Sequence, residues 1–327
     1  EKIEKINEAL VSSNQIKNLA GIGKAMIEKL EELIKTGKVK NLENLKNKYE
    51  NEYKKELEIE KKKEIFTNIY GIGEKKAEEL IEKKIETIED LELRQNELQK
   101  NKKALLNEKQ KIGLKYYKPL LKRIPREEIE EYKLNLTELF NETIKENNSK
   151  EEDNKFEIVG SYRRGKENSG DIDIIITSKN NDDKVYNKFI EKLQEKGILI
   201  ELLSNGKIKS LTIGKLPKEN AIARRLDFLY SPPDEYAFAI LYFTGSKEFN
   251  TAMRQHALNN DLTLNEHGFH KIKDRMKEDK VNDKIFNTEK DIFDYLNLEY
   301  KEPSERIDEN SIIILSNKDK DEDENKD

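Results

Sequence analysis

The sequence predicts an α+β protein of several domains, in which a helical region precedes a mixed α/β domain and a small α+β subdomain. From residue 1 to about residue 125, apolar side chains recur at three- and four-residue spacing, which is typical of amphipathic helices. After Pro125, short β-branched runs alternate with helical periods, which predicts a mixed β-sheet with helices packed against it. A chain of 327 residues is long enough for two or three such domains.

The expected elements follow this pattern along the chain. Strands are expected at Phe156–Val159, Asp171–Thr177, Ile198–Leu203, Leu211–Ile213 and Arg225–Tyr230, with a helix over Lys184–Glu195. Pro232 and Pro233 mark a domain boundary. Further helices are expected at Tyr236–Leu241, Glu248–Asn259 and Lys290–Leu298.

Composition excludes several classes of protein. The absence of Cys rules out a disulfide scaffold, a thiolate zinc site and a Cys nucleophile. No apolar run approaches the ~20 residues that a membrane-spanning helix needs. The net charge of −5 argues at first against a nucleic-acid partner. However, residues 102–126 hold nine Lys or Arg against one acidic residue, which predicts a local phosphate-binding surface.

Two similar glycine turns occur in the helical region. Residues 19–30 and 69–80 share the pattern Gly-Ile-Gly, with Gly21 and Gly23 in the first copy and Gly71 and Gly73 in the second. Such a turn exposes the free N–H groups of the following helix, where a nucleic-acid phosphate can bind. A single copy would fit an ordinary helix cap, but two copies predict helix-hairpin-helix units that bind DNA without reading its sequence.

A group of carboxylates follows in the mixed α/β domain. Asp171 and Asp173 lie two residues apart on an apolar strand, so they share one face of the sheet. Two adjacent carboxylates repel each other unless a divalent cation neutralises them, and hard oxygen ligands suit Mg²⁺. Asp227, on the run 224–230, is expected to supply a third ligand from a neighbouring strand. Before this pair, residues 160–170 offer Gly-Ser turns and arginines for a triphosphate.

These motifs together resemble those of the family X DNA polymerases, and of their beta-type members most. The resemblance covers nearly the whole chain, with matching motifs at residues 19–23, 69–73, 110–116, 122–128, 160–177, 224–227, 242–246, 249–258, 265–266 and 291–295. It implies a partial lyase-like domain with the first hairpin (1–52), a DNA-binding subdomain with the second (53–126), a nucleotidyltransferase-type catalytic palm (127–232) and a nucleotide-selecting subdomain (233–303). Residues 304–327 are expected to form an acidic, disordered tail because of their composition.

The resemblance also implies roles for individual residues. Asp171, Asp173 and Asp227 would bind two Mg²⁺ ions, and Asp227 would accept or relay the proton of the primer 3′-OH. The triphosphate would be held by Arg123, Ser161, Arg164, Ser169 and Gly170, and the sugar and base by Tyr242, Phe243, Gly245 and Asn250. DNA would be contacted by the hairpin glycines and by Arg254. Na⁺ or K⁺ would bind carbonyls of Thr67, Ile69 and Ile72, and of Leu19 and Ile22.

Some positions depart from the family pattern. Lys29 occupies the position of the nucleophile of a 5′-deoxyribose-phosphate lyase, but Ala25 replaces a second basic residue and the chain is shortened before it. We therefore expect weak or absent lyase activity. Leu229 stands where close relatives have an Arg that competes for Asp227, which suggests an altered closing equilibrium. Lys247 replaces an acidic residue beside the incoming base, which predicts tighter nucleotide binding.

The predicted function is therefore repair-type filling of short gaps in duplex DNA, with base excision repair as the setting. The expected partners are gapped or nicked DNA and dNTPs, without a membrane and as a monomer. We expect an intracellular location, nuclear in a eukaryotic cell. Two alternatives remain: a template-independent terminal nucleotidyl transferase, and a non-catalytic DNA-binding scaffold. The three histidines (His256, His267 and His270) are scattered and are interpreted as structural or surface residues.

Overall fold

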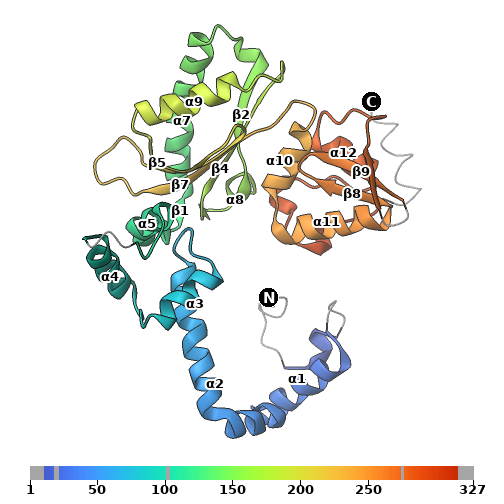
Figure 1. The fold of residues 1–327 in the computed structure, drawn as a ribbon. Coiled ribbons are helices and arrows are strands. Elements are labelled where there is room, and N and C mark those ends of the chain that lie inside the picture. Colours follow the sequence, from blue (N-terminus) through green and yellow to red (C-terminus); the bar gives the residue numbers. More distant parts are fainter. Residues whose placement is uncertain (1–10, 18–21, 101–103, 274–275, 316–327) are drawn as a thin grey trace. The chain divides into compact units, whose positions relative to one another are not determined.

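A computed structural model describes residues 11–17, 22–100, 104–273 and 276–315 of the chain (Figure 1). The chain divides into two compact units, Glu1–Leu106 and Asn107–Asp327, which are described separately. The division lies inside the predicted subdomain 53–126. In the described residues, no helix is long and apolar enough to cross a membrane.

The first unit is helical, as predicted. After a short 3-10 turn, η1 (Ser13–Gln15), its helices are α1 (Lys24–Thr36), α2 (Lys40–Thr67), α3 (Glu74–Glu82) and α4 (Ile88–Lys100). The second Gly-Ile-Gly turn joins α2 to α3, so the structure confirms a helix on each side of it. Gly71 has a φ of +84°, a conformation that favours glycine, and this explains its place in the turn.

The second unit opens with short elements that lead into a sheet. Helices α5 (Glu108–Lys115) and α6 (Tyr117–Leu120) precede strand β1 (Ile124–Pro125), which pairs with β3 (Asn168–Ser169). The pairing of Ile124 with Ser169 brings the end of the basic segment beside the glycine-rich turn. Three further helices of this part are α7 (Arg126–Glu146), α8 (Gly160–Arg163) and α9 (Lys184–Glu195).

A five-stranded mixed sheet forms the centre of this unit. Its order is β2-β4-β7-β6-β5, with bounds β2 Asn154–Ile158, β4 Ile172–Ser178, β7 Arg224–Tyr230, β6 Lys209–Gly214 and β5 Leu199–Asn205. Strands β4 and β7 are parallel and the other neighbours are antiparallel. All five predicted strands are confirmed, with small differences at their ends.

Alternate residues of the central strands pack on opposite faces of the sheet, because strand side chains alternate. Ile174 joins a core with Phe140 of α7 and Phe189 of α9, and the Phe140 and Phe189 ring centroids lie 5.1 Å apart. Ile175 packs instead against α10 (Tyr236–Thr244). Asp173 lies two residues before Ile175 on the same strand, so the alternation places its carboxylate on the face that α10 covers.

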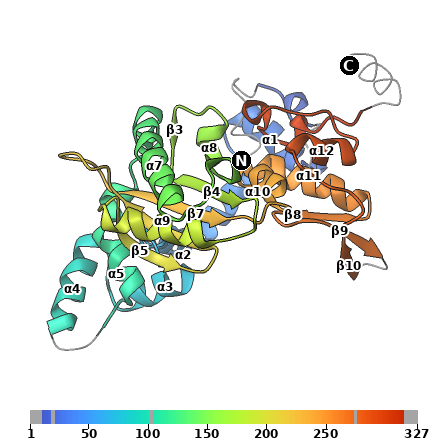
Figure 2. The same ribbon diagram turned by 90° about the horizontal axis from the view of Figure 1, so that it is seen from above.

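The small C-terminal subdomain combines helices with a three-stranded sheet (Figure 2). Besides α10 it contains α11 (Lys247–Asn259), β8 (Leu262–Asn265), β9 (Gly268–Lys273), β10 (Met276–Lys280), α12 (Glu289–Tyr295) and the short turns η3 (Pro303–Glu305) and η4 (Glu309–Ser311). Its core includes Phe238, Phe269 and Phe286, whose rings lie within 5.0–5.5 Å of one another.

The prediction that residues 304–327 form a disordered tail is wrong for residues 304–315. The Arg306 side chain is fully buried and pairs with Glu289 at the start of α12, and Ile314 forms a β-bridge with Leu298. A buried charge must be paired to be tolerated, so this ion pair fixes the segment on the subdomain. The acidic composition of the segment gave no sign of this ordered structure. Residues 316–327 lie outside the described residues.

Candidate active site

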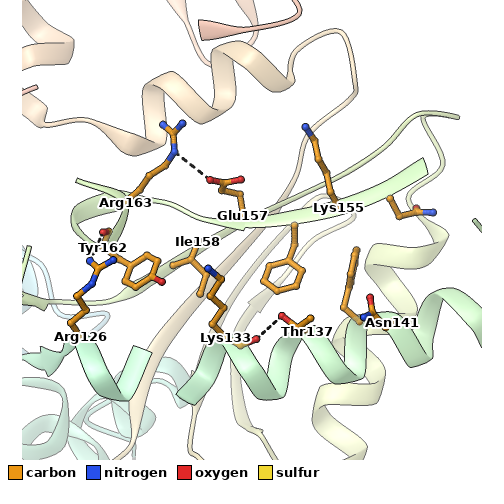
Figure 3. A pocket seen from close by; sticks show the side chains of 12 residues that line it. Arg126, Lys133, Thr137, Asn141, Lys155, Glu157, Ile158, Tyr162 and Arg163 are labelled. Atoms are coloured by element: carbon orange, nitrogen blue, oxygen red, sulfur yellow. Dashed lines mark hydrogen bonds and ion pairs between the residues drawn. The ribbon is translucent and has the colours of Figure 1, made fainter. Parts of the chain in front are cut away.

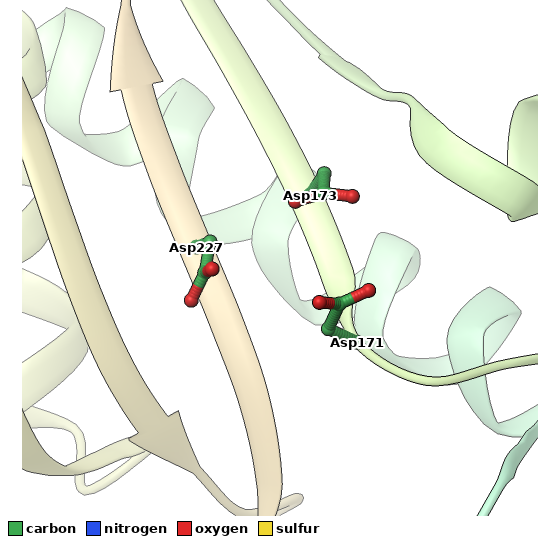
Figure 4. A group of neighbouring side chains, drawn as sticks. All are labelled: Asp171, Asp173 and Asp227. Atoms are coloured by element: carbon green, nitrogen blue, oxygen red, sulfur yellow. The ribbon is translucent and has the colours of Figure 1, made fainter. Parts of the chain in front are cut away.

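Three aspartates meet on the sheet, as the sequence predicts. Strands β4 and β7 run parallel with Asp173 directly opposite Asp227, and Asp171 lies just before β4 (Figure 4). One carboxylate oxygen from each residue lies within 4.8 Å of those of the other two. The parallel register is what brings together two residues that are more than fifty positions apart in the chain. The arrangement can hold a divalent cation by all three carboxylates at once.

The electrostatics of this group favour a cation. Burial, with the charges of Asp171 and Asp227, raises the pKa of Asp173 to about 7. Burial also raises the pKa of Asp227, although the neighbouring Arg225 opposes the shift. In addition, the buried Oδ1 atom of Asp227 has no hydrogen-bond partner among the described residues. An orphaned oxygen in a group of three carboxylates fits Mg²⁺, which takes hard oxygen ligands.

Arg225 is a member of the site whose role the sequence did not assign. Its guanidinium pairs with the Oδ2 atom of Asp227, which lies two residues along the same strand. Strand alternation was the available signal, since it places both residues on one face. Because Arg225 binds the carboxylate that a metal ion would also use, the two cations compete for Asp227.

A glycine allows the close approach of the turn before the site. Gly160 has a φ of +63°, and a Cβ atom at this position would lie only 2.7 Å from the Oδ2 atom of Asp173. Both the conformation and the contact therefore exclude larger residues. This explains the Gly-Ser pair in physical terms, because the glycine lets the turn pass beside the carboxylate.

We expect Gly160→Ala to lower catalytic turnover by about 10- to 100-fold, because the new methyl group displaces a metal-binding carboxylate. Gly165→Ala is the matched control, because Gly165 also has a positive φ (+78°) but has no atom within 4 Å of the added Cβ. Turnover of both variants should be measured on the same gapped DNA. Equal losses in the two variants would show that backbone strain alone is responsible.

A pocket of about 760 Å³ lies beside the aspartates. It gathers most of the predicted nucleotide residues in one place. Its lining consists of Arg123, Gly160, Ser161, Arg164, Gly170, Asp171, Asp173, Tyr242, Phe243, Gly245, Lys247, Asn250, Thr251 and Arg254. Ser169 does not line this pocket. It is buried, and its hydroxyl accepts a hydrogen bond from Ser161 at 2.7 Å, so it orients the serine that does.

The two predicted triphosphate arginines are held by neighbouring backbone and side chains. Arg123 donates from Nε to the side chain of Asn168 at 2.9 Å and from Nη2 to its carbonyl at 3.1 Å. Arg164 donates to the carbonyl of Thr244, and burial lowers the pKa of its guanidinium. Fixed arginine donors are suited to phosphate oxygens, because their planar fork matches the anion geometry.

The remaining lining comes from the α10–α11 junction. The rings of Tyr242 and Phe243 are 5.1 Å apart, and Asn250 donates to the Tyr242 carbonyl at 2.6 Å. Gly245 has a φ of +66°, and a Cβ there would lie 3.2 Å from Nη1 of Arg164. Thr251 was not predicted. Its only sequence signal is its place one helical turn after Lys247.

The helical unit contains the predicted cation site and the lyase position. Ile69 and Ile72 are buried, Thr67 is half-buried, and the Ile69 carbonyl accepts a hydrogen bond from the Ile72 N–H at 3.0 Å. Gly73 and Gly23 are the N-caps of α3 and α1. Ile22 is half-buried and Lys29 is exposed on α1. The remaining first-hairpin predictions, Leu19 and Gly21, lie outside the described residues.

The fold and the site define a class of protein: a mixed sheet that presents three aspartates beside a glycine-rich turn and an arginine-lined pocket is typical of nucleotidyltransferases. Comparison with family models agrees. Residues 64–121 match the fingers domain of DNA polymerase lambda, residues 123–233 the DNA polymerase beta palm and residues 239–307 the DNA polymerase beta thumb. The chain belongs to the family X DNA polymerases.

Curated relatives carry names from the same family. The chain is 31% identical to DNA polymerase lambda of Arabidopsis thaliana and 30% identical to that of Rattus norvegicus, over 93% of its own length and 56% and 50% of theirs. It is 26% identical to DNA nucleotidylexotransferase of Xenopus laevis, over 91% of its length and 60% of the relative. The chain thus spans little more than half the length of these relatives.

Proposed function

We propose that the protein is a DNA-directed DNA polymerase that fills short gaps in duplex DNA during base excision repair. One observation carries the proposal: the three aspartates, with oxygens within 4.8 Å of one another, lie beside a pocket lined by Arg123, Arg164 and Arg254. Metal-binding carboxylates next to fixed arginines suit the transfer of a nucleotide from a triphosphate.

The site residues divide the work of the reaction. Asp171, Asp173 and Asp227 would hold two Mg²⁺ ions. These ions would lower the pKa of the primer 3′-OH and neutralise the charge of the triphosphate. Arg123 and Arg164 bind the triphosphate, and Asp227 takes up or relays the proton that leaves the 3′-OH. A bond forms between the primer 3′ oxygen and the α-phosphorus while the bond to the β-phosphate oxygen breaks, and pyrophosphate leaves.

Selection of the nucleotide belongs to the α10–α11 side of the pocket. Tyr242, Phe243 and Gly245 would lie against the sugar, where the backbone would exclude a ribose 2′-OH. Asn250 and Arg254 would contact the base pair and the minor groove. Ser161 and Gly170 would complete the triphosphate contacts, with Ser169 holding Ser161 in place.

DNA binding would use the hairpins and the basic segment. The Gly-Ile-Gly turns present helix N-termini to phosphates, with Na⁺ or K⁺ bridging carbonyls of the turn to the DNA backbone. Within the basic segment, Lys111 and Lys115 form ion pairs with Glu108 and Glu201, so only part of its charge is available to DNA. We propose that the protein acts on this DNA as a monomer inside the cell, in the nucleus if the cell is eukaryotic.

The test is extension of a primer across a one-nucleotide gap with Mg²⁺, with and without a 5′-phosphate at the gap. Templated incorporation of the complementary dNTP is expected. The same assay with a single-stranded primer addresses the alternative that the nucleotidylexotransferase relative raises. Untemplated extension that exceeds gap filling would refute the proposal, and so would DNA binding without any incorporation.

Lys247 is expected to strengthen nucleotide binding, because it adds a positive charge to the pocket that receives the triphosphate. Lys247→Asp should weaken the dNTP affinity by about three- to tenfold. Pre-steady-state incorporation at varied dNTP concentration measures this affinity. Lys188→Asp, on the exposed side of α9, makes the same change of charge away from the pocket and should have no effect. An unchanged affinity for Lys247→Asp would remove the proposed role.

We further propose that any 5′-deoxyribose-phosphate lyase activity of this chain is residual. Lys29 is exposed on α1, so in the described part of the chain its amine does not lie in a buried pocket that would hold it for Schiff-base chemistry. Borohydride trapping on an incised abasic substrate should give little covalent adduct. A strong adduct that disappears in Lys29→Ala would show a competent lyase.

A further inference from the structure

A groove runs along the outer edge of the palm sheet, between helix α7 and strand β2 (Figure 3). We call it the edge groove. It has a volume of about 510 Å³ and is lined by Arg126, Lys133, Thr137, Phe140, Asn141, Asn154, Lys155, Phe156, Glu157, Ile158, Tyr162 and Arg163. None of these residues has been given a part in the reaction, and none lines the nucleotide pocket.

The floor of the groove is an open sheet edge. Strand β2 is the last in the sheet order and pairs only with β4. The Val159 N–H donates to the Asp173 carbonyl at 2.9 Å, and the Lys179 N–H donates to the Asp153 carbonyl at 2.8 Å. Because ladder bonds alternate along an antiparallel strand, the backbone groups of Phe156 and Ile158 point away from β4.

These outward groups lack hydrogen-bond partners in the part of the chain that the structure describes. Among the described residues, no hydrogen bond outside the sheet ladder uses the backbone N–H or C=O of Phe156 or Ile158. The side chain of Asn154 is also incompletely paired, since its Oδ1 atom is buried without a partner although the residue lines the groove and is only 7% exposed. Unpaired strand edges are where proteins add further strands.

The helical wall of the groove carries free positive charge. Lys133, Thr137 and Asn141 follow one another at four-residue spacing on α7, so they share one face of the helix, and Figure 3 shows them facing the strand. Lys133 is exposed and pairs with no carboxylate in the described part of the chain. Arg126 is held over the Tyr162 ring at 4.3 Å, donates to the Tyr162 carbonyl at 2.8 Å and lies 3.7 Å from the carboxylate of Glu130, so the free charge of this wall is that of Lys133.

The strand side of the groove is also positive. The Lys155 ammonium lies 4.0 Å from the centroid of the Tyr236 ring and makes no ion pair with a described residue. Glu157 is the one carboxylate of the lining, and it lies 3.4 Å from Nε of Arg163. Arg163 also forms an ion pair with Glu289, with 2.7 Å between Nη2 of Arg163 and Oε2 of Glu289. The groove therefore presents uncompensated lysines and no free carboxylate.

We propose that the edge groove binds an extended acidic segment of a partner protein, which adds to the palm sheet as a strand beside β2. The open backbone groups of Phe156 and Ile158 would pair with the backbone of the added strand. Acidic side chains on that strand would meet Lys133 on one side and Lys155 on the other. A nucleic acid would satisfy the lysines but offers no backbone that matches a strand edge, so a peptide fits both features.

The test uses a fluorescent, end-capped peptide of alternating Glu and Val residues, with anisotropy measured against the full chain. Binding is expected, and Lys133→Glu should weaken it about fivefold or more. Lys145→Glu is the matched control, because Lys145 is an exposed lysine of α7 that does not line the groove. Both variants should retain normal gap filling, since neither residue belongs to the nucleotide pocket.

A second peptide tests the proposal on the unaltered protein, so its result does not depend on how the variants fold. Methylation of alternate backbone nitrogens removes the strand-pairing donors while it leaves the charge intact, and it should abolish binding. Equal binding of the methylated peptide, or equal binding by Lys133→Glu, would overturn the proposal. Displacement of the acidic peptide by a single-stranded oligonucleotide, or tighter peptide binding after deletion of residues 316–327, would assign the groove to a different occupant and overturn it as well.

Discussion

Asp227→Asn is expected to reduce nucleotide incorporation into gapped DNA by at least about 10³-fold while DNA binding changes little. The substitution keeps the shape of the side chain but removes the charge of a carboxylate that lies directly opposite Asp173. It also removes the group proposed to take the proton from the 3′-OH. Loss of a metal ligand and of a proton acceptor together accounts for an effect of this size. Single-turnover extension with saturating dNTP measures it, and DNA affinity is measured separately by anisotropy.

The control for this variant is Asp294→Asn, which removes a carboxylate from the exposed ion pair with Lys290 on α12. It should incorporate nucleotides at the normal rate. Arg225→Ala tests the site in a second way, because Arg225 pairs with Asp227 and competes with a metal ion for that carboxylate. A lower Mg²⁺ requirement is expected for Arg225→Ala. Near-normal extension by Asp227→Asn would refute the assignment of the site.

The sequence could predict the parts of the site that follow from strand alternation. Asp171 and Asp173 are two residues apart, so period two placed both on one face of their strand. In the second strand the same period placed Asp227 on the face opposite Leu226 and Phe228. What it could not provide is the register. The pairing of Asp173 with Asp227 depends on how two distant strands align, and this was known only by resemblance to a family.

Other features were beyond sequence reasoning because they depend on long-range contacts between charges. The burial of Arg306 against Glu289 contradicted a tail predicted from acidic composition, since composition reports the average charge and not the location of one ion pair. The Arg225–Asp227 pair was concealed for a related reason, because alternation shows that two residues share a face but not that they touch. The orientation of Ser161 by the buried Ser169 is a third example.

Asp173→Asn is expected to stabilise the metal-free protein at pH 8 and to have little effect at pH 3. The pKa of Asp173 is raised to about 7 in the folded protein, mainly by burial and then by its two carboxylate neighbours, whereas the ordinary value is 3.8. A raised carboxyl pKa means that the folded state holds the proton more tightly than the unfolded state. The associated stability is present below the unfolded pKa and is lost as the pH rises toward about 7.

The asparagine variant does not ionise, so it should avoid this loss. At pH 8 its gain in the free energy of unfolding should be on the order of 2–4 kcal/mol. The gain should nearly vanish at pH 3, where Asp173 is largely protonated in both the folded and the unfolded wild-type protein. Thermal denaturation in the presence of a chelator measures both values. Addition of Mg²⁺ at pH 8 should stabilise the wild-type protein more than the variant, because only the wild type has all three ligands. A gain that is the same at both pH values would show that the carboxylate is not strained by burial, and the argument that the three aspartates require a cation would fail with it.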